Sequence, residues 1–130
     1  MSVLDLMRRL DPTVNHDPAE ARHLRDESIK AAHDHAHKAW LDMAEQCVRH
    51  CAQYLDEYTN DDVQAEIEHR CKLMRDLGAE PPSTHEPRAL GAVTRKLVRA
   101  GLIEKTGRYV TSNRKSNHAQ PIPVWRRATQ

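Results

Sequence analysis

Three arginines recur at helical spacing in the C-terminal third of the sequence. Arg88, Arg95 and Arg99 stand at i, i+7 and i+11, so a helix places them on one stripe, with Lys96 beside it. A guanidinium group donates paired hydrogen bonds to phosphate oxygens or to the O6 and N7 atoms of guanine. The spacing therefore predicts a helical surface that contacts nucleic acid; a solvated helix face is the alternative.

A second group of donors lies in residues 106–125, which carry cations and no acid. Two tracts of strand-forming residues, 108–112 and 121–125, flank the polar run NRKSNHA, and this pattern predicts a hairpin with a basic, mobile tip. Such a tip suits a phosphate backbone or the minor groove. The predicted contact residues here are Arg108, Ser112, Asn113, Arg114, Lys115, Asn117 and His118.

The charge of the chain is strongly segregated, although its net value is only +1. Residues 1–84 hold ten Lys and Arg against seventeen Asp and Glu, whereas residues 85–130 hold ten against two. The resulting blocks, at −7 and +8, favour a polyanion as the partner of the basic part. The alternative is that the basic part docks on the acidic part of the same chain.

Cysteines and histidines raise the possibility of a metal site. Cys47 and Cys51 share a helix face, and Cys71 with a histidine would complete four ligands for zinc. The thiols lie on apolar stripes without a C-x-x-C spacing, which favours small buried side chains instead. In the tract AHDHAH (32–37) only two of the three histidines share a helix face. We expect no metal and no cofactor.

Signals of catalysis are weak. The chain has four Gly and no glycine-rich phosphate loop, and no Ser/His/Asp constellation has a recognisable setting. Asp61, Asp62 and Glu66 are candidates for a metal-dependent nuclease, but they serve equally well in capping and solvating a helix. We therefore expect neither an enzyme nor a small-molecule substrate.

The elements that must position these residues are mainly helices. Asp17 and Pro18 form a helix start, followed by a polar stretch to about residue 35. An amphipathic helix is predicted over 33–57. Its buried stripe is Trp40, Met43, Ala44, Cys47, Cys51, Tyr54 and Leu55. We expect an N-terminal arm or helical extension over 1–35 and one domain over 36–130.

Two further helices have clear boundary signals. Thr59 and Asp62 form a capping box for a helix over 60–77, which Gly78 ends. Its predicted apolar face is Val63, Ile67, Cys71, Met74 and Leu77.

The next helix is expected over 85–100, with Ser83 and Glu86 as its capping box. Its core positions are Leu90, Val93, Leu97 and Val98. Gly91 and Ala92 lack bulk, which favours close packing against the preceding helix over close approach of DNA. In the hairpin, Val110 is expected opposite Ile122 and Val124, and prolines 121 and 123 restrict the returning strand to a sheet edge.

Bulk properties fit a small protein outside membranes. The 130 residues suit one compact domain, and no apolar run approaches the roughly 20 residues of a membrane span. The start MSVLDLMRRLDP lacks the features of a signal peptide, and three cysteines indicate free thiols. We expect a cytoplasmic protein.

Three helices followed by a hairpin is the order of a winged helix-turn-helix domain. The segment over 58–126, above all HEPRALGAVTRKLVRAGLIEKTGRYVTSNRKSNHAQPIPVWR, resembles winged helix-turn-helix proteins of bacteriophages, especially those of actinobacteria. The resemblance implies sequence-specific binding of double-stranded DNA, with the recognition helix over 85–100 and the wing over 106–125. A transcriptional regulator or replication-associated factor in the host cytoplasm is expected. A homodimer through 33–57 would match paired half-sites; a protein-interaction module is the alternative.

Overall fold

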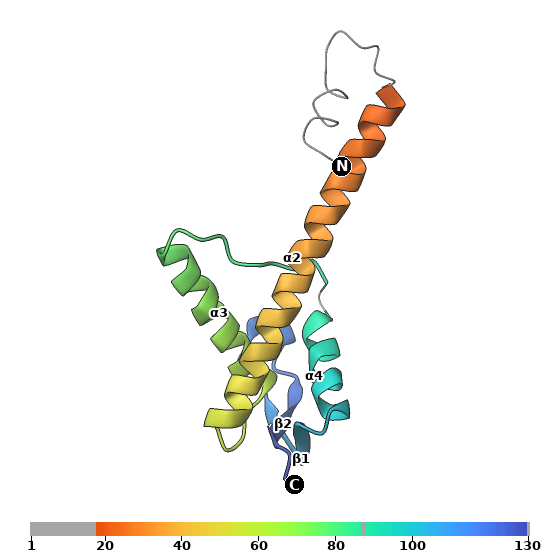
Figure 1. Cartoon of the computed structure of the whole chain (residues 1–130). Coiled ribbons are helices and arrows are strands. Elements are labelled where there is room, and N and C mark those ends of the chain that lie inside the picture. The colour runs from red at the N-terminus through yellow and green to blue at the C-terminus, as the bar shows by residue number, and fades with distance from the viewer. Residues whose placement is uncertain (1–17, 87, 130) are drawn as a thin grey trace. The chain divides into compact units, whose positions relative to one another are not determined.

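The computed structural model describes residues 18–86 and 88–129. It contains α2 (Pro18–Tyr54), α3 (Asn60–Asp76), α4 (Ala89–Arg99), β1 (Ile103–Thr111), the 3-10 helix η1 (Lys115–Asn117) and β2 (Pro121–Arg127) (Figure 1). The predicted class, mainly helical with one small β-hairpin, is confirmed. No helix in these ranges is long and apolar enough to cross a membrane. Of the arm predicted over 1–35, residues 1–17 lie outside the described part.

Helix α2 extends further toward the N-terminus than the predicted segment over 33–57, and it ends earlier, at Tyr54. The chain divides between His35 and Ala36 into two compact units. From residue 18 to the end of the first unit, nearly all side chains are exposed. In the second unit α2 buries Met43, Ala44, Cys47, Val48, Cys51 and Ala52.

The buried stripe predicted on this helix is correct except at its end. Trp40 is half-buried against the core, but the side chains of Tyr54 and Leu55 are 67% and 44% exposed. The helix stops at Tyr54, so the helical spacing no longer governs the residues that follow. After the turn it is Tyr58, 2% exposed, that enters the core.

Both ends of α3 form as the sequence predicts. The N–H of Thr59 donates to the Asp62 carboxylate at 2.8 Å, which satisfies one end of the capping box. At the other end Gly78 adopts a φ of 81°, a left-handed conformation that glycine reaches without a steric penalty. The N–H of Ala79 then donates to the carbonyl of Met74 at 2.9 Å. This bond closes the Schellman motif.

Helix α4 begins at Ala89, four residues later than predicted. The capping box expected from Ser83 and Glu86 does not form. Instead the Thr84 hydroxyl accepts the N–H of Glu86 at 3.2 Å, and this local turn competes with a helical start. Glu86 also precedes a proline in the sequence, where the helical conformation is disfavoured.

Two predicted core positions are exposed, Leu77 at 86% and Val98 at 41%. The first lies beyond the last residue of α3, whose C-terminal end diverges from α2 (Figure 1). In α4 the buried face instead includes Thr94, whose hydroxyl donates to the Leu90 carbonyl at 3.0 Å. The other predicted core positions of α4, Leu90, Val93 and Leu97, are buried.

The hairpin is longer than the two predicted tracts, because β1 already begins at Ile103 and β2 continues to Arg127. The strands are antiparallel, with Val110 opposite Ile122 as predicted. Val124 is buried, but it is not opposite Val110.

A bulge interrupts the ladder between Lys105 and Tyr109. Gly107 adopts a φ of 86° within it, as a bulge of this kind requires. The Thr106 hydroxyl donates to the carbonyl of Val124 at 3.1 Å, which links the two strands across the bulge.

A third backbone segment joins the hairpin at a single bridge. The N–H of Tyr58 donates to the Trp125 carbonyl at 2.9 Å, and the N–H of Trp125 donates to the Tyr58 carbonyl at 2.7 Å. Because backbone groups alternate along a strand, the nitrogens of Pro123 and Pro121 face the same side as that of Trp125. They offer no N–H, so pairing on this side ends at Tyr58, and β2 has the predicted edge there.

Side chains from α2, α3, α4 and the hairpin form one core. Its most completely buried large side chains are Cys47, Val48, Val63 and Leu97. Ile103 and Trp125 bring the two strands into the same cluster. The hairpin is therefore part of the core-bearing unit and not a separate appendage.

Removing the buried hydroxyl of Tyr58 should test whether this group lowers the free energy of unfolding. The Tyr58 hydroxyl and the Trp125 indole N–H are buried without a hydrogen-bond partner in the described residues. An unpaired buried donor destabilises a fold by about 1–3 kcal/mol. We expect Tyr58→Phe to keep or raise the free energy of unfolding in urea denaturation. A clear loss of stability would show that the hydroxyl is hydrogen-bonded in solution.

Candidate nucleic-acid interface

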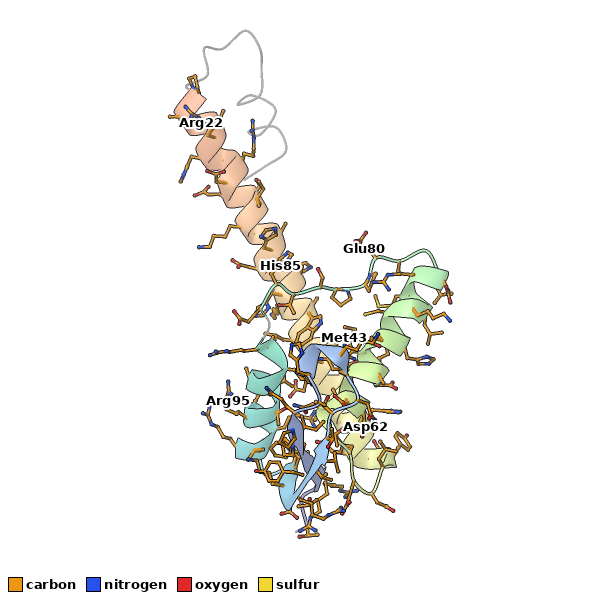
Figure 2. The ribbon with its side chains drawn as sticks, turned by 180° about the vertical axis from the view of Figure 1, so that it is seen from behind. Arg22, Met43, Asp62, Glu80, His85 and Arg95 are labelled. Carbon is orange, nitrogen blue, oxygen red and sulfur yellow. The ribbon has the colours of Figure 1, made fainter. Side chains whose placement is uncertain are left out.

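Helix α4 separates an apolar face from a basic one. Its buried side chains are Ala89, Leu90, Val93, Thr94 and Leu97. Arg88, Arg95 and Arg99 are exposed on the other side, where Figure 2 shows Arg95 directed away from the core. The predicted stripe is thus at the surface of a helix whose orientation is fixed by the core.

The guanidinium groups of this stripe are not paired with acids of the described residues, although the backbone N–H of Arg88 donates to the Glu86 carboxylate at 3.4 Å. Within residues 18–86 and 88–129, Arg88, Arg95 and Arg99 form no ion pair. The neighbouring Lys96 has its Nζ 3.3 Å from Oε1 of Glu45, and its side chain is 70% exposed. An exposed pair of this kind is worth little, so Lys96 remains available to another anion.

Gly91 does not contact a neighbouring helix, which corrects the packing role expected for it. The nearest atom to a Cβ placed there is the Arg95 Nη1, at 3.6 Å, an ordinary van der Waals distance. The guanidinium group of Arg95 therefore lies close to the backbone at Gly91.

Gly91→Ala should stabilise the protein. The new methyl group fits, and alanine favours a helix interior over glycine by about 0.8–1 kcal/mol. We expect a higher melting temperature by circular dichroism, with Ala92→Gly as the control that lowers it. A fall in melting temperature for Gly91→Ala would contradict the open space at this position.

The hairpin tip is anchored and does not present all its donors, contrary to the prediction. Ser112 is 5% exposed, and its hydroxyl donates to the Asp61 carboxylate, with oxygen distances of 3.0 and 2.9 Å. The N–H of Asn113 donates to the same carboxylate at 2.8 Å. The Ser112 hydroxyl also accepts from the Arg114 N–H at 3.2 Å and from Nδ2 of Asn117 at 3.0 Å. These donors are engaged within the protein.

Two predicted contact arginines pair with acids of the N-terminal half. The Arg114 Nη1 lies 2.8 Å from Oε1 of Glu68 on α3, and its side chain is 34% exposed. Arg108 pairs with Glu57, and both side chains are more exposed. For these residues the alternative interpretation, in which the basic part docks on the acidic part, is the one the structure supports.

The outward groups of the tip are fewer than predicted. Lys115, His118 and the side chain of Asn113 are exposed, and His118 adopts the left-handed conformation with a φ of 49°.

Arg127, an exposed cation at the end of β2, was not among the predicted contact residues. Lys105, whose Nζ lies 5.6 Å from the Trp125 ring centroid, was not among them either. Alternation along the strands would have placed both on the face of the buried Ile103 and Trp125, so the sequence pattern provided no signal for their exposure.

The three acids considered for a nuclease each have a protein partner. Asp61 accepts from the hairpin tip, Asp62 accepts from the N–H of Thr59, and Glu66 accepts from Nε of Arg70 at 2.9 Å. This hydrogen bond to Glu66 is the main cause of the raised pKa of Arg70. The described part of the chain contains no cluster of three or more His, Cys, Asp or Glu suited to one metal ion.

The cysteines behave as core side chains. Cys47 and Cys51 are buried, Cys71 is half-buried against the same core, and all three are free thiols. Burial raises the pKa of both Cys47 and Cys51 from 9.0 to about 11. Of the histidines in the tract over 32–37, the Nδ1 of His37 lies 2.6 Å from the Thr84 hydroxyl.

The buried thiols should make stability sensitive to alkaline pH. The unfolded chain releases these protons from about pH 9, whereas the folded chain retains them to about pH 11. Their contribution to stability is therefore complete below pH 9 and falls as pH rises through this window. Urea denaturation at several pH values should show this fall, and Cys47→Ala with Cys51→Ala should reduce it. An unchanged fall in the double variant would assign it to other groups.

The geometry thus leaves α4 as the principal basic surface, beside a hairpin whose tip is fixed to α3. In comparisons with known proteins, no protein-family model, no curated protein and no solved structure matches this chain.

Proposed function

We propose that this protein is a winged helix-turn-helix protein that binds double-stranded DNA, with α4 as its recognition helix. The observation that carries the proposal is the exposed pair Arg95 and Arg99 on α4, a helix fixed by its apolar face, with exposed Arg88 at its N-cap. The guanidinium groups of all three form no ion pair within the described residues. An α-helix fits the major groove, where arginine recognises guanine and phosphate. We propose binding without catalysis.

The order of elements supports this proposal. The second unit has a helical segment ending at Tyr54, the bridge at Tyr58, then α3, α4 and a hairpin, which is the order of a winged helix-turn-helix domain. The connection over 77–88 is longer than the three- or four-residue turn of the basic motif. The recognition surface in this proposal therefore depends on α4 and the hairpin rather than on a tight turn.

The hairpin supplies a smaller contact than the sequence suggested. Lys115 and His118 are its outward candidates, while the Arg114 guanidinium group is held by Glu68. Contacts from Arg95 and Arg99 of α4, from Arg88 at its N-cap, from Lys96 and from Lys115 would release counterions when they neutralise phosphates. Five such contacts give a slope of about −4.5 for log K against log salt concentration.

The biological setting belongs to the same proposal. A phage-encoded transcriptional regulator or replication-associated factor in the host cytoplasm fits a small DNA-binding protein of this kind. A homodimer through 33–57 would place two recognition helices on paired half-sites. The exposed Tyr54 is available for that contact, whereas Trp40 already packs against the core of its own chain.

A protein-interaction module is the second candidate, favoured by an apolar hollow between α2 and α3. Its cavity volume is about 420 Å³, and it is lined by Ala39, Asp42, Met43, Gln46, Arg70, Leu73, Met74 and Pro82. Leu77, just beyond α3, is 86% exposed. A protein partner would cover this side of the molecule and leave the arginines of α4 unused.

Arg95→Ala combined with Arg99→Ala should weaken DNA binding at least tenfold. The variant loses two guanidinium groups from the recognition face, and the salt slope should fall in magnitude by about 2. Fluorescence anisotropy with a labelled DNA duplex at several salt concentrations measures both quantities.

The matched control is Lys72→Ala with Arg75→Ala, which removes the same charge from exposed positions on α3. It should change binding much less. Equal losses for the two double variants would reduce the effect to net charge, and unchanged binding of the α4 variant would overturn the recognition-helix assignment.

A further inference from the structure

One carboxylate organises the whole hairpin tip. The Asp61 carboxylate accepts hydrogen bonds from the Ser112 hydroxyl and from the N–H of Asn113. The Ser112 oxygen in turn accepts from the N–H of Arg114 and from Nδ2 of Asn117. The tip closes on itself where the N–H of Ser112 donates to the Gln120 carbonyl at 2.9 Å. A segment of polar residues between two strands thus acquires a defined conformation.

Asp61 and Asp62 are adjacent in the sequence but form different contacts. Asp62 accepts from the N–H of Thr59 and caps α3. Asp61 lies in the same first turn of α3, but its carboxylate contacts residues more than fifty positions away in the sequence. Capping therefore engages the carboxylate of Asp62, whereas the carboxylate of Asp61 is engaged by the tip.

The anchored tip has an inner and an outer side. The inner groups are the buried Ser112, the half-buried Asn117 and the Arg114 guanidinium group that pairs with Glu68. The outer groups are Lys115 and His118, which are exposed. The N–H of His118 donates to the Lys115 carbonyl at 3.1 Å, so the backbone of the outer side is also fixed.

We infer that Asp61 is a positioning residue for DNA binding: it holds the hairpin tip so that Lys115 is presented in a fixed place. This inference rests on the proposed function. A flexible tip would lose conformational freedom when it bound a phosphate, and that loss would reduce affinity. Anchoring through Asp61 removes most of this loss before DNA arrives.

The sign of one mutational effect separates positioning from simple electrostatics. Asp61 is an acid close to a proposed polyanion site, so removing its charge alone should strengthen DNA binding. Removing the anchor should weaken it, because the tip becomes mobile. The two interpretations predict opposite changes for the same substitution.

The experiment compares Asp61→Ala with Asp76→Ala in the full chain. Asp76 is an exposed acid at the other end of α3 and forms no ion pair within the described residues, so its substitution removes the same charge and no anchor. The probe is a labelled mixed-sequence DNA duplex of about 20 base pairs at low salt. We expect Asp61→Ala to bind about fivefold more weakly, and Asp76→Ala to bind as tightly as the wild type or more tightly.

Two further variants separate the anchor from the stability of α3. Ser112→Ala removes the other half of the anchor and leaves every charge in place, so it should weaken binding to a similar extent. Asp61→Asn keeps an oxygen that accepts one hydrogen bond and should recover most of the affinity. Hydrogen exchange at the amides of Asn113 and Arg114 should quicken in Asp61→Ala while the amides of α4 keep their protection.

A double-mutant cycle provides the readout that a purely structural role would not move. Lys115→Ala should weaken binding at least fivefold in the wild-type background and have little effect in the Asp61→Ala background, because an unanchored tip no longer places Lys115 on the duplex.

Two failures are distinguishable. If the wild type does not bind the duplex, or if the α4 double variant binds as tightly as the wild type, the proposed function falls and the inference falls with it. If the wild type binds through α4 but Asp61→Ala binds at least as tightly as Asp76→Ala, only the positioning role is overturned. Additive effects of Asp61→Ala and Lys115→Ala would also overturn that role.

Discussion

The hairpin depends on the backbone pairing between Tyr58 and Trp125. These two hydrogen bonds connect the turn after α2 to the second strand of the hairpin, and both residues are buried in the core. Because α3 begins immediately after Tyr58, the same pairing brings the first turn of α3 beside the tip. The anchor at Asp61 thus follows from a contact made elsewhere on the strand.

The basic residues of the C-terminal block fall into two groups, those that pair with acids of the N-terminal half and those that do not. Lys96, Arg108 and Arg114 pair with Glu45, Glu57 and Glu68 of the acidic half. The arginines of α4 remain without such partners in the described part of the chain. Charge complementarity within the molecule therefore accounts for part of the basic block. The remaining cations are Arg95 and Arg99 on α4, Arg88 at its N-cap, and Lys105, Lys115 and Arg127 in the hairpin.

Local signals in the sequence predicted the helices well. Thr59, Asp62 and Gly78 defined α3 because each acts through residues only a few positions away. The predicted start of α4 was wrong because signals this local can compete with one another. The turn at Thr84 and Glu86 forms in place of the capping box that the pattern suggested. The period of α4 predicted its buried Leu90, Val93 and Leu97, but it wrongly included Val98 and missed Ala89 and Thr94.

Contacts between distant residues were beyond such patterns. Ser112 and Asp61 are fifty-one positions apart, and either residue alone has an ordinary local explanation. The exposed arginines were therefore predictable as a group, whereas the distinction between inner and outer donors of the tip required the tertiary structure.

The two prolines of β2 have a consequence for encounters between molecules. An exposed sheet edge is a template on which a foreign strand can assemble, and natural proteins obstruct such edges. On the N-terminal side of Trp125, Pro121 and Pro123 offer this edge no N–H groups for the hydrogen bonds that an incoming strand would need. The hairpin thus has built-in protection against intermolecular sheet growth along β2, and any such growth would have to start from β1.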